Sequence, residues 1–183
     1  MVSKPIGALA ILVLAFGALA DEPDFSPVTS LAVDLQRVAE LGTVSPVDGI
    51  TSAGQPDKAA LEVFADSGYA TVIDMRGREE DRGFDEAAFV EELGLHYVAF
   101  PIENEEDISF ARARQLDELL RELPGPVLVH CASGNRVGAL LALRASLGGA
   151  ADEDALKLGR DGGLTRLEPV VRERLAEGDN RGQ

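Results

Sequence analysis

The sequence predicts an α/β fold in which a mostly parallel central sheet is flanked by helices in three layers. Short apolar runs rich in β-branched residues alternate with longer segments of helical periodicity. Glycine and proline separate these segments, at intervals that leave room for a helical crossover between one strand and the next. Hydrophobic residues make up 45% of the 183 positions, which is enough for one packed core.

The first twenty residues are expected to be a secretory signal peptide. Lys4 precedes an apolar run over residues 6–20, which is shorter than the roughly 20 residues that a membrane-spanning helix needs. The run ends in the small-x-small pattern Ala18-Leu19-Ala20. We therefore expect cleavage between Ala20 and Asp21 and a periplasmic or secreted mature protein without stable membrane insertion. The alternative is an uncleaved N-terminal anchor.

Three further segments are expected after cleavage. Residues 21–44 form an N-terminal segment with one short helix, because Leu31, Leu35 and Val38 are spaced like one face of a helix. Residues 45–177 form a single domain. Residues 178–183 form a disordered tail.

Periodicity and breakers divide the domain into alternating elements. The strands are expected at residues 49–52, 70–75, 95–100 and 127–130. Five helices are expected at residues 58–66, 85–93, 137–147, 152–158 and 164–176. One more is expected between an N-cap at Ser109 and the breakers at 124–126.

The charge balance restricts the partners. The formal net charge is −15, and loss of Lys4 with the signal peptide makes it −16. Nucleic acid and anionic membranes require a basic surface, so neither is expected to bind. The single cysteine, Cys131, excludes an internal disulfide and a cysteine-cluster metal site. We expect no metal and no cofactor.

The loop after the last predicted strand contains the residues expected to carry the chemistry. Cys131 follows the apolar run 127–130, at the strand end where ligands bind in parallel sheets. Arg136 lies five residues further on, and its planar fork suits two oxygens. Small or flexible residues between them allow the backbone amides to converge on an anion: Ala132, Ser133, Gly134 and Asn135.

The same electrostatic environment would stabilise Cys131 as a thiolate, which is a nucleophile towards a bound phosphoryl group. The helix that follows the loop would add its positive end. The alternative is that Cys131 is a small buried hydrophobic residue, which is a common role for a free cysteine.

The motif His130-Cys131-x-x-Gly134 followed by Arg136 resembles the signature loop of cysteine-dependent protein tyrosine and dual-specificity phosphatases. The likeness extends upstream through residues 52–56, 68–76 and 97–102, in the order seen in bacterial phosphatase-like proteins related to the phosphatase-like domain of the beta-lactamase hydrolase family. The resemblance implies that Cys131 attacks phosphorus, that Arg136 and the loop amides bind the phosphoryl oxygens, and that a carboxylic acid protonates the leaving group.

The loop departs from that pattern at two points. It has one residue fewer between Gly134 and Arg136 than the tyrosine phosphatase loop, and this spacing resembles that of rhodanese sulfurtransferases. Val137 stands where phosphatases usually have Ser or Thr, whose hydroxyl helps the thiolate to leave. Slower breakdown of a phosphocysteine would follow.

Glu103 is the expected general acid. In the family the acid comes from a loop near this point, which here is the acidic segment 103–107 after Pro101 and Ile102. If Asn104 occupies the equivalent position instead, the acid is absent, because an amide does not donate a proton usefully.

The leading hypothesis is an exported hydrolase of phosphomonoesters, phosphotyrosine among them, that forms a phosphocysteine. Its partner would be a phosphorylated small molecule or a phosphoprotein. The second hypothesis is a sulfurtransferase that forms a cysteine persulfide. The third is a module that binds phosphate or a phosphoprotein without catalysis.

Overall fold

The computed structural model describes residues 44–47 and 50–178, and both ranges belong to one compact unit. The predicted signal peptide, the helix expected within residues 21–44 and the tail beyond Gly178 lie outside the described residues. Among the helices in the described part, none has the length and apolar character to cross a membrane.

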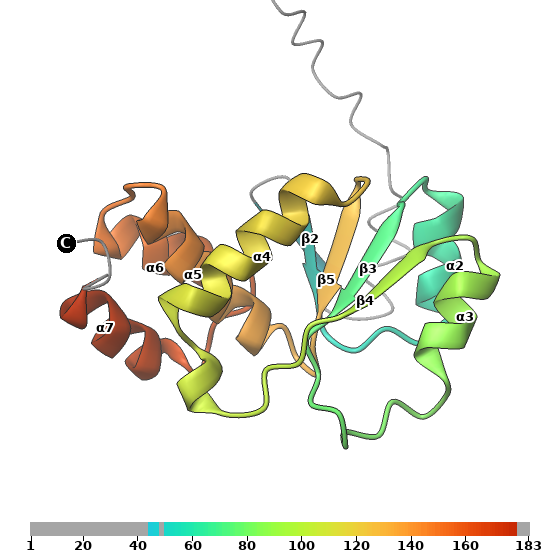
Figure 1. Ribbon diagram of the computed structural model, residues 1–183, viewed down its shortest axis with the longest axis horizontal. Helices are drawn as coiled ribbons and strands as arrows, with labels where there is room; N and C mark the ends of the chain where they lie inside the picture. Colours follow the sequence, from blue (N-terminus) through green and yellow to red (C-terminus); the bar gives the residue numbers. More distant parts are fainter. Residues whose placement is uncertain (1–43, 48–49, 179–183) are drawn as a thin grey trace, which may run out of the picture. The chain divides into compact units, whose positions relative to one another are not determined.

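A five-stranded sheet lies at the centre of the fold, and it confirms the predicted α/β class (Figure 1). Its strands have the order β1-β2-β5-β3-β4. The last four pair in parallel, while β1 pairs antiparallel with β2 at the edge. The bounds are β1 (Val44–Val47), β2 (Ile50–Ala53), β3 (Thr71–Asp74), β4 (His96–Ala99) and β5 (Val127–His130).

The antiparallel edge strand β1 was not predicted. Pro46 lies within it, and proline is tolerated in a sheet only where its missing N–H is not needed, as on an edge strand. The other four strands lie within the predicted runs or overlap them to within one residue.

Six helices surround this sheet in the described part of the chain. They are α2 (Lys58–Asp66), α3 (Glu86–Glu92), α4 (Phe110–Glu122), α5 (Asn135–Leu147), α6 (Asp152–Asp161) and α7 (Glu168–Glu177), together with a short 3₁₀ helix η1 (Glu105–Asp107). Three side chains cap their N-termini as acceptors of a backbone N–H: Asp57 for α2, Asp85 for α3 and Ser109 for α4.

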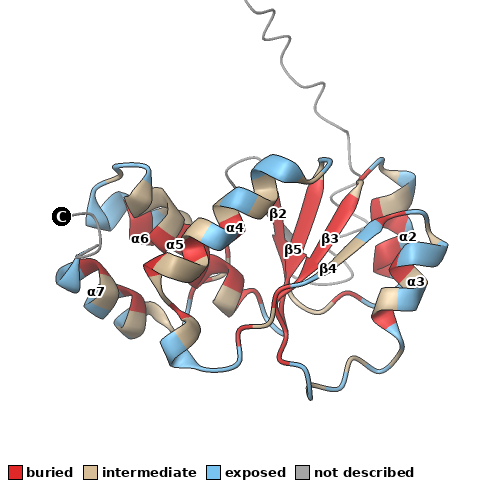
Figure 2. Cartoon of the chain, viewed as in Figure 1, coloured by how far each residue is buried: buried red, intermediate tan, exposed pale blue. Residues whose placement is uncertain are grey.

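The central strands are buried on both faces, so their side chains alternate between two separate apolar clusters (Figure 2). Val72 and Leu128 belong to the cluster under α2 and α3. Ile73 and Val129 belong to the larger cluster under α4 and α5. The helices on both faces hold the carboxyl ends of β3 and β5 side by side, which is where the loop containing Cys131 begins.

Helix α7 begins four residues later than the sequence predicted, at Glu168 instead of Leu164. The side chain of Asn135 accepts hydrogen bonds from the backbone N–H groups of Thr165 and Leu167, which holds this stretch in a non-helical path. Pro169 then occupies a first-turn position, where its missing N–H costs nothing.

The contact between α5 and α6 depends on glycine. A Cβ on Gly138 would lie 2.3 Å from the backbone nitrogen of Leu164 and 2.4 Å from the carbonyl oxygen of Gly159. Both atoms belong to the backbone, so the conflict could be relieved only by moving a helix or the turn after it.

Gly138→Ala should therefore lower the free energy of unfolding by about 3 kcal/mol, the upper range for overpacking a core. Gly148→Ala is the matched control, because Gly148 has φ −78° at the end of the same helix and an added Cβ there would come no closer than 3.3 Å to the carbonyl oxygen of Ala145. We expect a change of at most about 1 kcal/mol for the control. Urea denaturation measures both, and equal stabilities of the two variants would contradict this packing.

Candidate active site

The loop that starts at Cys131 packs against the segment that follows β2. The N–H of Cys131 donates to the carbonyl of Ala53 at 3.3 Å, and the N–H of Gln55 donates to the carbonyl of Ala132 at 3.3 Å. Gly134 ends the loop with φ +80°, a left-handed conformation that favours glycine. Helix α5 begins at the next residue, so its positive N-terminal end faces the loop.

Cys131 is buried, with 1% of its surface exposed, and packs in the same apolar cluster as Met75 and Val129. It is a free cysteine. The arginine of the loop lies near it. Hydrogen bonding to Glu80 raises the pKa of Arg136, and the proximity of Cys131 adds to that rise. The structure therefore brings Cys131 and Arg136 together, as the motif predicted.

Glu80 binds Arg136 through both carboxylate oxygens. Oε1 lies 2.5 Å from Nη1 of the arginine, and Oε2 lies 2.9 Å from Nη2. Arg76 Nε and the backbone N–H of Gly77 hold the same carboxylate from the other side. The hydrogen bond from Arg136 is the largest cause that lowers the pKa of Glu80 from 4.5 to about 2.

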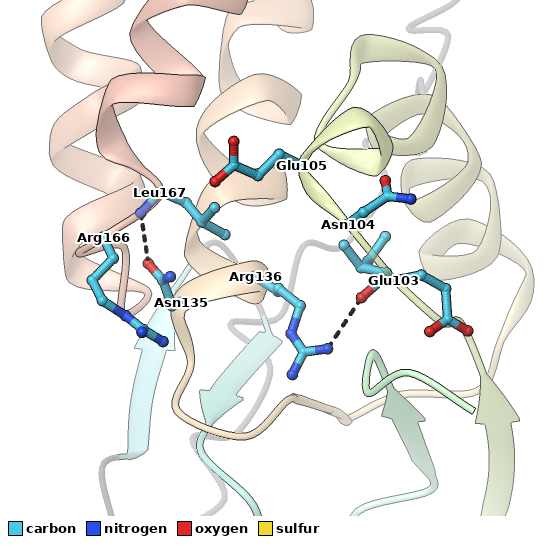
Figure 3. A pocket seen from close by; sticks show the side chains of 8 residues that line it. Glu103, Asn104, Glu105, Asn135, Arg136, Arg166 and Leu167 are labelled. Carbon is cyan, nitrogen blue, oxygen red and sulfur yellow. Dashed lines mark hydrogen bonds between the residues drawn. The ribbon is translucent and has the colours of Figure 1, made fainter. Parts of the chain in front are cut away.

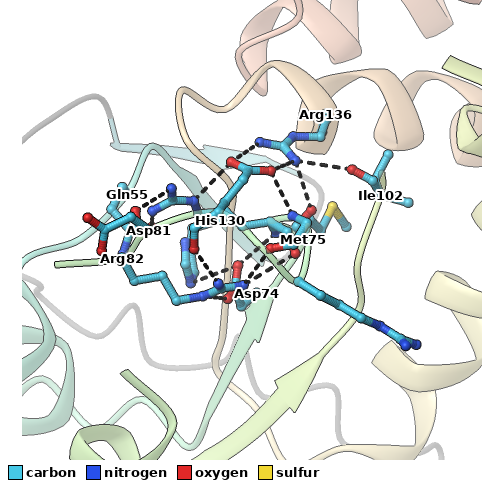
Figure 4. A network of polar contacts seen from close by, with 12 residues as sticks. Gln55, Asp74, Met75, Asp81, Arg82, Ile102, His130 and Arg136 are labelled. Carbon is cyan, nitrogen blue, oxygen red and sulfur yellow. Dashed lines mark hydrogen bonds and ion pairs between the residues drawn. The ribbon is translucent and has the colours of Figure 1, made fainter. Parts of the chain in front are cut away.

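Two backbone carbonyls complete the support of the guanidinium. Nη1 of Arg136 donates to the carbonyl oxygens of Met75 at 3.4 Å and Ile102 at 3.1 Å, and these contacts converge on one end of the fork (Figure 4). Nε has no hydrogen-bond acceptor among the oxygens of the described residues. The Nε edge therefore remains for another anion.

A second polar layer lies behind the loop and is more deeply buried. Asp74, at the end of β3, accepts hydrogen bonds from Arg82 Nε at 2.6 Å and the Tyr97 hydroxyl at 2.8 Å. Burial and this hydrogen bond raise the pKa of Tyr97. Burial acts to lower the pKa of Arg82, but the hydrogen bond to Asp74 raises it overall.

His130 faces carboxylates in this layer. Its Nε2 lies 2.7 Å from Glu86 Oε1 and 3.9 Å from Asp74 Oδ1, and the close approach to Glu86 lacks the alignment of a hydrogen bond. Gln55 Nε2 donates to the other oxygen of Glu86 at 2.8 Å. The structure thus places the His130 imidazole against two buried acids.

Asp74, Glu86 and His130 have the composition of a metal-ligand set, with their ligand atoms within 4.8 Å of one another. Both oxygens of Asp74 already accept hydrogen bonds, Oδ1 from the N–H of Arg76 and Oδ2 from Arg82 and Tyr97. A cation there would compete with these donors and with the charge of Arg82. The cluster is therefore a polar support for the loop in this structure.

A pocket of about 320 Å³ opens beside Arg136 (Figure 3). Its lining comes from the segment after β4, from the start of α5 and from the turn before α7: Ile102, Glu103, Asn104, Glu105, Asn135, Arg136, Arg166 and Leu167. Cys131 lies outside this lining. The pocket thus contains the predicted anion-binding arginine and the predicted acid but not the predicted nucleophile.

Glu103 lines the pocket, but its carboxylate points away from Arg136 (Figure 3). Its Oε1 accepts the backbone N–H of Arg78 at 3.1 Å, and the side chain is exposed. Asn104, the alternative position, caps η1 by accepting the N–H of Asp107 at 3.2 Å. The assignment of Glu103 as the acid stays a prediction.

The family model described as "DSP-PTPase phosphatase fused to NAD+ kinase" matches residues 20–156. The chain belongs to this phosphatase family. The match covers the strands, the loop from Cys131 to Arg136 and helix α5, and it ends within α6.

Solved structures share the fold of this phosphatase domain. A candidate phosphatase from Neisseria meningitidis is 20% identical, with a TM-score of 0.60, and the match covers 73% of this chain and 95% of that one. A candidate phosphatase from Shewanella putrefaciens is 15% identical, with a TM-score of 0.59 and coverages of 78% and 97%. TpbA from P. aeruginosa is 20% identical, with a TM-score of 0.53 and coverages of 74% and 90%. No curated protein matches the sequence.

Sequence reasoning missed two residues of this phosphatase site. Glu80 lies in a run of charged residues, 78–82, that follows the end of a predicted strand. A carboxylate at that place in the chain could have indicated a partner for Arg136. Arg166 lies beyond the region that the motifs cover, and no pattern in the sequence linked it to the loop.

Glu80→Gln should lower the free energy of unfolding by about 1 kcal/mol at pH 7, a figure that allows for solvent screening of a partly exposed pair. The folded-state pKa of Glu80 is depressed, so its contribution is present above pH 4.5 and is lost as the pH falls towards about 2. The gap between wild type and variant should narrow over that range in urea denaturation. Glu79→Gln is the control, because Glu79 is exposed. A gap that stays constant with pH would contradict the ion pair.

Proposed function

We propose that this chain is a cysteine-dependent phosphatase of phosphomonoesters that acts outside the cytoplasm. Membership of the phosphatase family supports hydrolysis of a phosphate ester. The observation that carries the proposal is the arrangement of Arg136. Glu80 binds its two terminal nitrogens, and its Nε, which donates to no oxygen in the described part of the chain, remains for the oxygens of a phosphoryl group.

In the proposed reaction the thiolate of Cys131 attacks phosphorus, so an S–P bond forms while the ester P–O bond breaks. The departing oxygen takes a proton from a carboxylic acid. Water then cleaves the S–P bond, which releases inorganic phosphate and regenerates the thiolate. Arg136 and the amides of the loop from Ala132 to Arg136 stabilise the negative charge that the phosphoryl oxygens carry through both steps.

Glu103 is the proposed acid. It needs only to exchange its hydrogen bond to the N–H of Arg78 for one to the leaving oxygen, because it already lines the pocket beside Arg136. The segment that presents it is well supported, since the backbone N–H of Glu103 donates to Asp107 Oδ2 at 2.7 Å. An exposed carboxylate on a supported turn can move its side chain while its backbone stays in place.

Purified protein should hydrolyse para-nitrophenyl phosphate, and Cys131→Ser should abolish this activity. Glu103→Gln should lower kcat by about 100-fold, which is a typical loss for a general acid. Glu105→Gln is the matched control, because Glu105 lines the same pocket on the adjacent 3₁₀ helix. A loss that is equal in the two variants would remove Glu103 from the acid role.

The same sample distinguishes the other functions. Formation of thiocyanate from thiosulfate and cyanide, without phosphatase activity, would replace the proposal with a sulfurtransferase, the activity favoured by the shorter loop spacing. Binding of inorganic phosphate with neither activity would leave a non-catalytic module. In the proposed case, mass spectrometry of acid-quenched enzyme should find one phosphoryl group on Cys131.

The proposal of export rests on residues 1–20, with Lys4 followed by an apolar run and a small-x-small ending. Expression in a bacterium should give a processed protein outside the cytoplasm that begins at Asp21, which intact-mass analysis measures. An Ala20→Leu variant should be processed poorly, because signal peptidase requires a small residue there. An intact N-terminus on exported wild-type protein would overturn the cleavage.

A further inference from the structure

The turn between α6 and α7 is tied to the signature loop by one side chain. Oδ1 of Asn135 accepts the backbone N–H of Thr165 at 2.8 Å, the hydroxyl of Thr165 at 3.2 Å and the N–H of Leu167 at 3.3 Å. Asn135 is buried, with 6% of its surface exposed, and it immediately precedes Arg136. The position of this turn relative to the anion-binding arginine is therefore fixed by a hydrogen-bonded contact within the loop.

Arg166 lies between the two residues that Asn135 holds, and its side chain lines the same pocket as Arg136. Figure 3 shows the side chains of Arg166 and Arg136 on either side of Asn135, both extending in the same direction. Arg166 is exposed, and it makes no hydrogen bond or ion pair with any residue in the described part of the chain.

An unpaired arginine in this pocket is notable because acidic groups are in excess. The chain has 32 acidic and 17 basic residues, and neighbouring arginines such as Arg160 and Arg172 are paired with Glu168. The lining contains the acidic residues Glu103 and Glu105 and the basic residues Arg136 and Arg166. Glu80 binds Arg136, so Arg166 is the arginine of this lining whose charge has no partner in the described part of the chain.

We propose that Arg166 is a specificity-determining residue that binds a second anionic group of the substrate. This inference rests on the proposed phosphatase function. The scissile phosphoryl group lies at the Nε edge of Arg136, and a second oxyanion of the same molecule, a phosphate or a carboxylate, lies against Arg166.

The strength of this contact is limited by exposure. A charge-assisted hydrogen bond to an exposed arginine is screened by solvent and salt, so we expect a discrimination of about tenfold instead of the larger values of buried pairs. The preference should weaken as the salt concentration rises.

The kinetic test compares phenyl phosphate with carboxyphenyl phosphate and with phenylene bisphosphate. Wild type should have a kcat/KM about tenfold higher for at least one of the doubly anionic substrates, and Arg166→Gln should remove that ratio. Arg166→Lys should retain part of it because the charge remains. A preference for the bisphosphate alone identifies the second group as phosphate, and a preference for both identifies any oxyanion; either supports the proposal.

Arg121→Gln is the matched control, because Arg121 is an exposed arginine on α4 that pairs with Asp117 and lies outside the pocket lining. It should keep the wild-type ratio. A ratio that is unchanged in Arg166→Gln, or that falls equally in Arg121→Gln, would overturn the assignment.

A binding measurement separates failure of this inference from failure of the proposed function. Calorimetry with the wild-type chain should show methylenebisphosphonate, which is not hydrolysed, binding about tenfold more tightly than inorganic phosphate, and Arg166→Gln should equalise the two. If binding behaves in this way but the chain has no phosphatase activity, the second anion site stands and the proposed function fails. If the chain has phosphatase activity but wild type binds both probes equally, the proposed function stands and the second anion site fails.

Discussion

The ion pair between Arg136 and Glu80 is the interaction on which the site depends. A guanidinium placed next to an amide-lined loop could adopt several rotamers, and its long side chain would lose conformational entropy on binding an anion. Glu80 holds both terminal nitrogens, and Met75 and Ile102 hold one of them through their carbonyls. The Arg136 side chain therefore loses its conformational entropy when the protein folds and not when an anion binds. Its Nε edge is already in position before binding.

The deeper polar layer explains how a loop at a strand end can be held firmly. Parallel strands β3 and β5 place Asp74 and His130 opposite each other in the sheet register, and α3 adds Glu86 from one side. Burial makes each of these groups costly unless it has a partner, so Arg82, Tyr97 and Gln55 converge on the two carboxylates. The backbone N–H of Met75 donates to the carbonyl of His130 at 2.8 Å, and this bond ties the end of β5 to the loop after β3, which carries Glu80.

The sequence predicted those features that depend on local periodicity or on a contiguous motif. The limits of α2 and β5, the N-cap at Ser109 and the proximity of Cys131 to Arg136 all follow from residues close together in the chain. The contact of Glu80 with Arg136 and that of Asn135 with residues 165–167 span 56 and about 30 positions. Contacts between residues so far apart produce no periodic pattern in the sequence. The second of them is the reason that α7 starts four residues later than predicted.

In the proposed function, the site divides into a part that carries out the reaction and a part that selects the substrate. Cys131, the loop and Arg136 lie within residues 20–156, the region shared with the phosphatase family, and Cys131 is buried. Arg166 lies outside that region, yet Asn135 of the shared loop fixes its position. Under the two proposals, Asn135, which binds the turn before α7, couples the catalytic loop to a specificity element of this chain. In the proposed mechanism, recognition requires an open wall, which Arg136 lines, whereas the buried Cys131 is shielded from water.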